Sequence, residues 1–237
     1  MFYLFPNLLW CRGCVDDLLY FFVHDFWFSE TVNNLGHSSS LVTVIMSNTF
    51  ALLLFGIQHS VMARPTFKGW FTRYIDPSIE RSTYILATSA AITGMCYLWI
   101  PFGSVIWKVE SEIGVYLIYA VAVFGWVFLF LATFMINHFE LFGLRQTFDL
   151  MQGKLVSAST SRITGFYKIV RHPIQTGILV GLWAVPISTS SHQVFAAGMS
   201  IYIFIGLYFE EKDSIQEFGE AYVDYMKRFK RVIPFIV

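Results

Sequence analysis

The residues with the clearest chemical potential are Arg171-His172-Pro173, which end a basic loop. Pro173 suits the first turn of a helix, where its missing N–H would have no helical partner anyway. A helix starting there would hold Arg171 and His172 at its N-terminal end, where backbone N–H groups also favour anions. The three residues therefore predict a clamp for a carboxylate. The alternative is that Arg171 only anchors a loop at a membrane surface.

A second signal is Glu211, which lies within an apolar stripe at helical spacing. The apolar members of the stripe are Phe204, Leu207, Ile215, Phe218, Tyr222, Tyr225 and Phe229. A carboxylate that faces inward at a membrane boundary needs a partner or a ligand. We therefore expect Glu211 to lie in a polar cavity, paired either with an inward Arg or Lys such as Arg171 or with a bound molecule.

The remaining candidate ligands and nucleophiles are scattered. The six histidines are His24, His37, His59, His138, His172 and His192, and none has the H-x-x-H spacing of a helical zinc site. Cys11 and Cys14 form an isolated C-x-x-C without a second ligand pair, so we expect no metal there. His138 follows Asn137 at the end of an apolar run, where it is either an interfacial cap or part of a polar cavity.

The elements that position these residues are membrane helices. Of the 237 residues, 56% are hydrophobic and only 14% are charged, against about 25% charged in soluble domains. No charged residue occurs in 31–63, 82–107, 113–139 or 173–209. Since a spanning helix needs about 20 apolar residues, we predict spans at Leu41–Val61, Thr83–Pro101 and Ile113–Ile136, then a helical hairpin of Ile174–Ile187 and Val194–Phe209.

The sequence thus predicts an all-α, polytopic membrane bundle with a C-terminal hairpin and a tail helix on the cytoplasmic side. Residues 41–237 form the membrane domain, and residues 1–40 are an interfacial segment or a degraded span. This arrangement places every Lys and Arg except Arg12 and Lys108 on one side, which is the cytoplasmic side by the positive-inside rule. The formal net charge is zero, so no basic field is available for nucleic acid.

Several motifs resemble those of integral-membrane methyltransferases, which include isoprenylcysteine carboxyl methyltransferases and phospholipid methyltransferases. The resemblance rests on four C-terminal segments: Phe166–Gly177, Glu210-Glu211, Phe218–Tyr225 and Arg231–Pro234. Three upstream segments look like the methanethiol S-methyltransferase branch, which is related to nurim and NnrU-type proteins: Gln58–Pro65, Glu80–Tyr84 and Asn137–Gln146. Together they cover roughly residues 50–237.

The resemblance implies transfer of a methyl group from S-adenosylmethionine to a small thiol, methanethiol, in a bacterial inner membrane. It implies a cofactor site formed by Arg171, His172, Pro173, Gln175, Gly177, Glu210, Glu211 and Tyr222. By position, His59, His138 and Gln146 line the acceptor pocket. No metal and no catalytic base are assigned. Gln175 stands where the superfamily usually has an aromatic residue, commonly Tyr.

Two alternatives stay open: methylation of a prenylated or lipid substrate, and a nurim-like structural membrane protein without turnover. The intact Arg-His-Pro and Glu pair favours an enzyme, since a purely structural protein has no physical reason to combine them. A channel or transporter would need ionisable residues in mid-span or inverted repeats, and the sequence has neither.

Overall fold

The computed structural model describes residues 32, 40–153 and 164–234. The expectations for residues 1–40, including Cys11 and Cys14, fall almost wholly outside this part. The chain divides into two compact units, which are described separately. The first comprises Met1–Phe102 with Asn137–Thr160, and the second comprises Gly103–Ile136 with Ser161–Val237.

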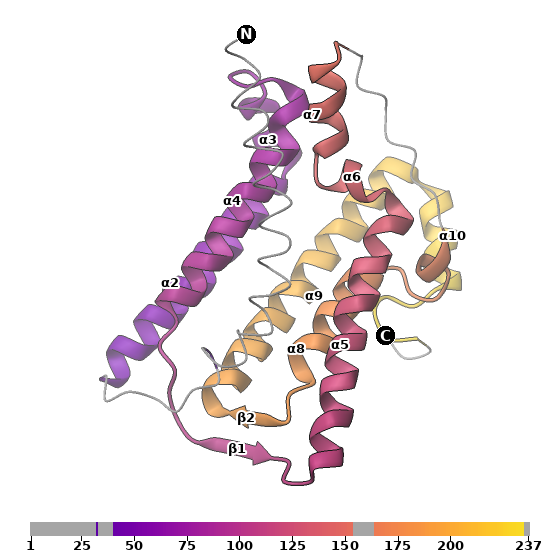
Figure 1. Ribbon diagram of the computed structural model, residues 1–237. Coiled ribbons are helices and arrows are strands. Elements are labelled where there is room, and N and C mark those ends of the chain that lie inside the picture. Colours follow the sequence, from indigo (N-terminus) through magenta and orange to yellow (C-terminus); the bar gives the residue numbers. More distant parts are fainter. Residues whose placement is uncertain (1–31, 33–39, 154–163, 235–237) are drawn as a thin grey trace. The chain divides into compact units, whose positions relative to one another are not determined.

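The described part of the first unit is helical (Figure 1). Its helices are α2 (Leu41–Ala63), α3 (Pro65–Phe71), α4 (Pro77–Leu98), α6 (His138–Leu141) and α7 (Leu144–Met151). Capping residues fix two of the starts: Ser40 accepts a hydrogen bond from the Thr43 N–H, and Asp76 accepts one from the Ser78 N–H. A proline also occupies the first turn of α3 and of α4, where it costs no hydrogen bond.

Polar side chains join the helices of the first unit at both ends of α4. Near its C-terminal end, the Asn48 amide of α2 both donates to and accepts from the backbone of Ile100, at 2.9 and 2.7 Å. Near its N-terminal end, the Ser82 hydroxyl lies 3.1 Å from the Thr147 hydroxyl of α7. These buried polar groups satisfy one another, as buried polar groups must, and they hold α2 and α7 against α4.

The second unit holds the other helices and one small sheet. In chain order its elements are β1 (Val105–Lys108), α5 (Glu112–Ile136), the 3₁₀ helix η1 (Gly165–Lys168), α8 (Pro173–Trp183), β2 (Ile187–Thr189), α9 (Ser190–Phe218) and α10 (Glu220–Arg228). β1 and β2 pair antiparallel, with Val105 opposite Thr189 and Lys108 opposite Ile187. The predicted all-α class is confirmed. The two short strands were not predicted, because their pairing joins segments far apart in the chain.

Helices α5 and α8 lie side by side (Figure 1) and meet at glycines. A Cβ atom added to Gly125 of α5 would lie 2.8 Å from the Gly181 nitrogen and 2.9 Å from the Gly177 oxygen of α8. Small residues four apart let two helix backbones approach closely, as they do in membrane bundles. The helix that starts at Pro173 is thereby fixed against α5.

Three of the described helices, α2, α5 and α9, are long and apolar enough to cross a membrane. The chain is an integral membrane protein. The predicted span Thr83–Pro101 falls largely in α4, which starts earlier, carries Glu80 and Arg81, and is not one of these three. The first hairpin arm is only 11 residues long, as α8. The second starts at Ser190, earlier than predicted, because Thr189 caps it by accepting from the His192 N–H.

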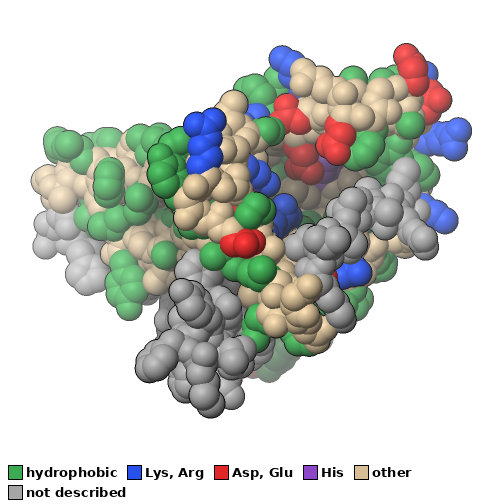
Figure 2. All heavy atoms as spheres, turned by 90° about the horizontal axis from the view of Figure 1, so that it is seen from above, with side chains coloured by type: hydrophobic (Ala, Val, Ile, Leu, Met, Phe, Trp, Pro, Cys, Tyr) green, Lys and Arg blue, Asp and Glu red, His purple; other side chains and the backbone are tan. Residues whose placement is uncertain are grey.

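The predicted apolar stripe does not continue along one helix. α9 has 29 residues, which is about 44 Å of helix against a hydrocarbon layer of about 30 Å. The charged residues from Glu210 onward predict that its C-terminal turns are the part outside that layer. It ends at Gly219, whose positive φ of 57° a side chain would disfavour. The stripe is wrong at Ile215 and Phe218, which are exposed, whereas its later member Tyr225 is buried on α10. Figure 2 draws all heavy atoms as spheres and shows acidic and basic side chains among hydrophobic ones in this view.

Candidate functional site

The Arg-His-Pro turn is paired along its backbone with residues 229–232, here called the C-terminal strap. The Arg171 N–H donates to the Lys230 carbonyl at 2.8 Å, and the His172 N–H donates to the Arg231 carbonyl at 3.0 Å. In the first turn of α8, the Thr176 hydroxyl donates to the Val232 carbonyl at 2.7 Å. The strap therefore fixes the residues that precede Pro173 as well as those that follow it.

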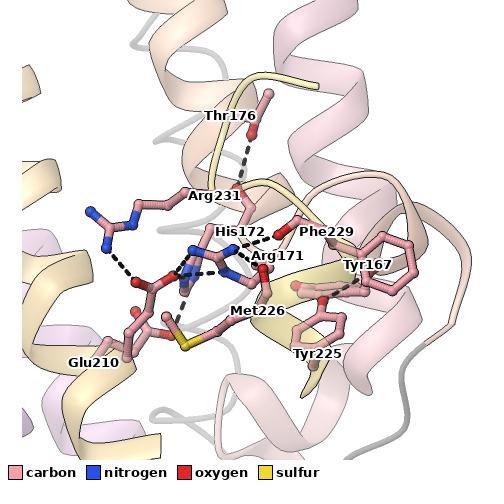
Figure 3. Close-up of polar contacts among 10 residues, drawn as sticks. Tyr167, Arg171, His172, Thr176, Glu210, Tyr225, Met226, Phe229 and Arg231 are labelled. Carbon is pink, nitrogen blue, oxygen red and sulfur yellow. Dashed lines mark hydrogen bonds and ion pairs between the residues drawn. The ribbon is translucent and has the colours of Figure 1, made fainter. Parts of the chain in front are cut away.

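Glu211 is the centre of an ion cluster. Figure 3 labels its three partners, Arg171, His172 and Arg231. Its side chain is only 3% exposed. Its Oε1 accepts from Arg171 Nε at 2.8 Å and Nη2 at 2.7 Å, and lies 3.1 Å from His172 Nε2. Its Oε2 pairs with Arg231 Nη2. A buried carboxylate costs several kcal/mol unless it is paired, and this one is paired on both oxygens.

Arg171 is committed to protein partners on all three nitrogens. Besides its two bonds to Glu211, it donates through Nη1 to the backbone carbonyls of Met226 and Phe229. Its side chain is 8% exposed. Of the two alternatives for Glu211, the pairing with Arg171 is thus observed, and Arg171 also fixes the junction between α10 and the strap.

Two further groups border the cluster. Glu210 is exposed, and its Oε1 lies 3.8 Å from His172 Nδ1. Burial, together with the negative charges of Glu211 and Glu210, raises the pKa of Tyr222 to about 12. The neighbouring Tyr225 donates from its hydroxyl to the Tyr167 carbonyl at 2.7 Å, which holds α10 against η1. The cluster therefore combines exposed and buried carboxylates, cations and a neutral phenol.

Comparison with known proteins shows the family. The chain is 42% identical over 199 residues to methanethiol S-methyltransferase 1 of Bradyrhizobium diazoefficiens, covering 84% of this chain and 70% of that protein. It is 39% identical over 213 residues to the methanethiol S-methyltransferase of Mycobacterium tuberculosis, covering 90% and 87%. The chain belongs to the methanethiol S-methyltransferase family.

The branch suggested by the motifs is also confirmed. Nurim of Sus scrofa is 28% identical over 170 residues, covering 68% of this chain and 64% of that protein. No family model and no solved structure matches the chain. With no matching solved structure, the geometry of the ion cluster in this member of the methanethiol S-methyltransferase family is the one described above for the second unit.

In this family member, the structure brings together four of the residues expected at the cofactor site, Arg171, His172, Glu210 and Glu211. Pro173 is buried at the start of α8, as expected for a first-turn proline. Gln175 is half-buried one residue before Thr176. Gly177 has another role: an added Cβ would lie 2.5 Å from the Gly125 oxygen, so helix packing already requires glycine there.

The residues expected at the acceptor pocket lie in the first unit. His59 of α2 is 2.9 Å from the Tyr84 hydroxyl of α4, and its Nδ1 is 3.3 Å from the Thr88 hydroxyl. Gln146 of α7 donates to the Glu140 carbonyl, and its Oε1 is buried without a hydrogen-bond partner in the described part of the chain. Burial lowers the pKa of His138 in α6. Within the described residues, no cluster of three His, Cys, Asp or Glu side chains could hold a metal.

Sequence reasoning missed the part that Arg231 plays. The residue entered only as part of the motif Arg231–Pro234, yet it closes the cluster through Glu211 Oε2. The available signal was electrostatic: a carboxylate expected to face inward needs compensating charge, and the tail after it is rich in cations. Helical periodicity gave no signal, because the strap is not helical.

Proposed function

We propose that this membrane protein transfers a methyl group from S-adenosylmethionine to methanethiol and so forms dimethyl sulfide. The names of relatives that align with more than four-fifths of this chain support this activity. Within the structure, the observation that carries the proposal is Glu211, a buried carboxylate held by two guanidinium groups and an imidazole. When bound, the cofactor supplies a sulfonium methyl group that a thiol sulfur attacks directly, so no strong general base is needed.

The residues of the cluster fit this cofactor by their chemistry. S-adenosylmethionine carries an ammonium, a carboxylate, a sulfonium and a ribose diol. Glu211 and the exposed Glu210 offer carboxylates for cationic groups or hydroxyls, and His172 offers a ring nitrogen beside both of them. Tyr222 offers a phenol that is protonated at neutral pH, as tyrosines ordinarily are, and burial and the neighbouring carboxylates raise its pKa further, to about 12.

The protein's own contribution is to position the binding groups and to exclude water from the site. Arg171 and the strap fix the Glu211 carboxylate before any ligand arrives, so little conformational freedom is lost on binding. Gln175, on the first turn of α8, replaces the usual aromatic residue as a neighbour of the cofactor and can both donate and accept hydrogen bonds. Alignment and a dry site are the effects that direct methyl displacement requires.

His59, His138 and Gln146 remain our candidates for the acceptor pocket. His59 is supported by its place within α2, one of the three described helices able to span a membrane, since polar groups inside such helices are functional candidates by default. Gln146 is supported by its buried, unpartnered Oε1. The S–H group of a small thiol is a weak hydrogen-bond donor, and the Gln146 Oε1 atom can accept a hydrogen bond from it.

The cellular placement is also part of the proposal. Residues 41–237 act as the methyltransferase domain in the bacterial inner membrane, with the C-terminus in the cytoplasm. The bias of Lys and Arg supports this orientation. A pair of C-terminal reporter fusions, one active only in the cytoplasm and one only outside it, tests it. Activity of the external reporter alone would contradict it.

The activity test uses bacterial membranes that contain the full chain. Membranes are supplied with S-adenosylmethionine and methanethiol, and headspace dimethyl sulfide is measured. We expect product from the wild type and none from His172→Ala or Glu211→Ala at matched protein levels. Methyl label in extracted lipid instead of headspace would assign a lipid acceptor. The absence of both products, together with no binding of S-adenosylhomocysteine by calorimetry, would leave a structural membrane protein.

A further inference from the structure

The two arginines on Glu211 are held in different ways. Arg171 is 8% exposed and uses Nε, Nη1 and Nη2, binding Glu211 and two backbone carbonyls. Arg231 is 28% exposed. In the part of the chain that the structure describes, its guanidinium has one partner, Glu211 Oε2, through one nitrogen (Figure 3). Arg171 cannot leave without stranding buried acceptors, whereas Arg231 can turn into solvent.

The backbone of Arg231 need not move for its side chain to do so. Its carbonyl accepts from the His172 N–H, and the next residue, Val232, is completely buried and accepts from Thr176. The guanidinium stands at the end of a long side chain on this fixed strap. A change of partner therefore requires only rotation of that side chain.

Release of Arg231 from Glu211 requires another positive group to replace it. Glu211 Oε2 would lose its cation, and a buried carboxylate tolerates this only if another positive group takes the place. Arg231 in turn would present an unpaired guanidinium at the rim of the site. Both requirements are met together by a ligand with adjacent positive and negative groups. The α-amino-acid end of S-adenosylmethionine has this chemistry.

We propose that Arg231 is an exchangeable counter-ion of Glu211. The ammonium of the bound amino-acid group takes its place on Oε2, and the freed guanidinium binds the carboxylate of the same group. This inference rests on the proposed function and assigns Arg231 as the residue that reads the cofactor's carboxylate. The exchange swaps one ion pair for two and leaves the net charge of the cluster unchanged.

The test compares two ligands on purified full-length protein by calorimetry. One is S-adenosylhomocysteine, and the other is its decarboxylated analogue, which keeps the amine and lacks the carboxylate. We expect Arg231→Gln to weaken S-adenosylhomocysteine binding by about 10- to 100-fold, the value of a charged hydrogen bond. The analogue, which offers Arg231 nothing, should bind the variant at least as well as the wild type. Arg228→Gln, an exposed cation of α10, is the matched control and should change neither affinity.

The outcomes separate this inference from the proposed function. Equal losses for both ligands in Arg231→Gln would make Arg231 a purely structural counter-ion and overturn the exchange alone. No binding of either ligand to the wild type would overturn the proposed function, and the exchange with it. If Arg231→Gln does not fold, the same two ligands are compared on Arg231→Lys. It keeps the charge but not the fork geometry, so an equal effect on both ligands would again overturn the exchange.

Discussion

The His172 N–H donates to the carbonyl of Arg231 over 3.0 Å. The two residues are far apart in the sequence, yet both reach the same carboxylate, His172 at Oε1 and Arg231 at Oε2. Their backbone bond fixes the distance between the two side chains that approach Glu211. The site is thus set by a long-range pairing as much as by the helices.

The first prediction concerns the charge of Glu211. Glu211→Gln leaves the buried Arg171 guanidinium without an anionic partner, and we expect a loss of about 3 kcal/mol or more in unfolding free energy. Thermal unfolding in detergent should show this loss of stability, and the headspace assay should show a loss of activity. Glu210→Gln is the control, since that side chain is 56% exposed and its removal should leave stability nearly unchanged. Equal stability of the two variants would contradict the ion cluster.

The second prediction concerns the strap. Val232 is fully buried against Ile203 and Leu207, so Val232→Ala should cost about 2 kcal/mol. It should also weaken S-adenosylhomocysteine binding, because the strap holds the Arg-His-Pro turn. The neighbouring Ile233 is 45% exposed, and Ile233→Ala should alter neither quantity. Calorimetric affinities that respond alike to both substitutions would show that the strap is not what organises the site.

The third prediction concerns the contact between α5 and α8. In Gly177→Ala the new methyl group would lie 2.5 Å from the Gly125 oxygen, so the helices must separate at a cost of about 1–3 kcal/mol. We expect less folded protein by size-exclusion chromatography. Gly206→Ala is the control, since nothing lies within 4 Å of its added Cβ. A normal yield of Gly177→Ala would disprove the close approach.

The fourth prediction concerns Tyr222. Its raised pKa, about 12, means that the folded protein binds the phenol proton more tightly than the unfolded chain, whose tyrosines titrate near about 10. The stability that this provides is fully present below pH ~10 and is lost as the pH rises through ~12. Tyr222→Phe should flatten that alkaline loss and remove one late-titrating phenol from the ultraviolet titration. An unchanged titration curve would refute the buried, acid-flanked environment.

The fifth prediction concerns the acceptor. His59→Leu removes the partner of Tyr84 within the helix pair α2 and α4. If His59 lines the thiol pocket, KM for methanethiol should rise several-fold while S-adenosylhomocysteine affinity stays constant. Trp70→Leu, at an exposed position of α3, should leave both unchanged. A loss of cofactor affinity with an unchanged KM would move His59 out of the acceptor pocket.

Much of the site could be predicted from local sequence. Pro173 gave the start of α8, and the charge-free stretches gave most of the helices. The spacing of Leu207 and Glu211 gave the inward face of α9, because both lie on one uninterrupted helix. These features depend on neighbours a few residues away.

The features that the sequence did not predict depend on residues that are far apart in the chain. The spacing argument assumed one helix through Phe229, but Gly219 interrupts it and turns Tyr225 toward Tyr167. The strap has no helical period and is placed by its bonds to residues 171–176. Arg231 therefore could be recognised as a cation in the tail, but not as the group that completes the cluster.

The order of the chain also gives the site an order of assembly. Helices α5, α8 and α9 are all translated before the strap, and Glu211 enters with α9. Until Arg231 and Val232 emerge from the ribosome, the Arg-His-Pro turn lacks its backbone partner and Glu211 Oε2 lacks its cation. A nascent chain that stalls before residue 231 therefore has α5, α8 and α9 but an incomplete ion cluster around Glu211.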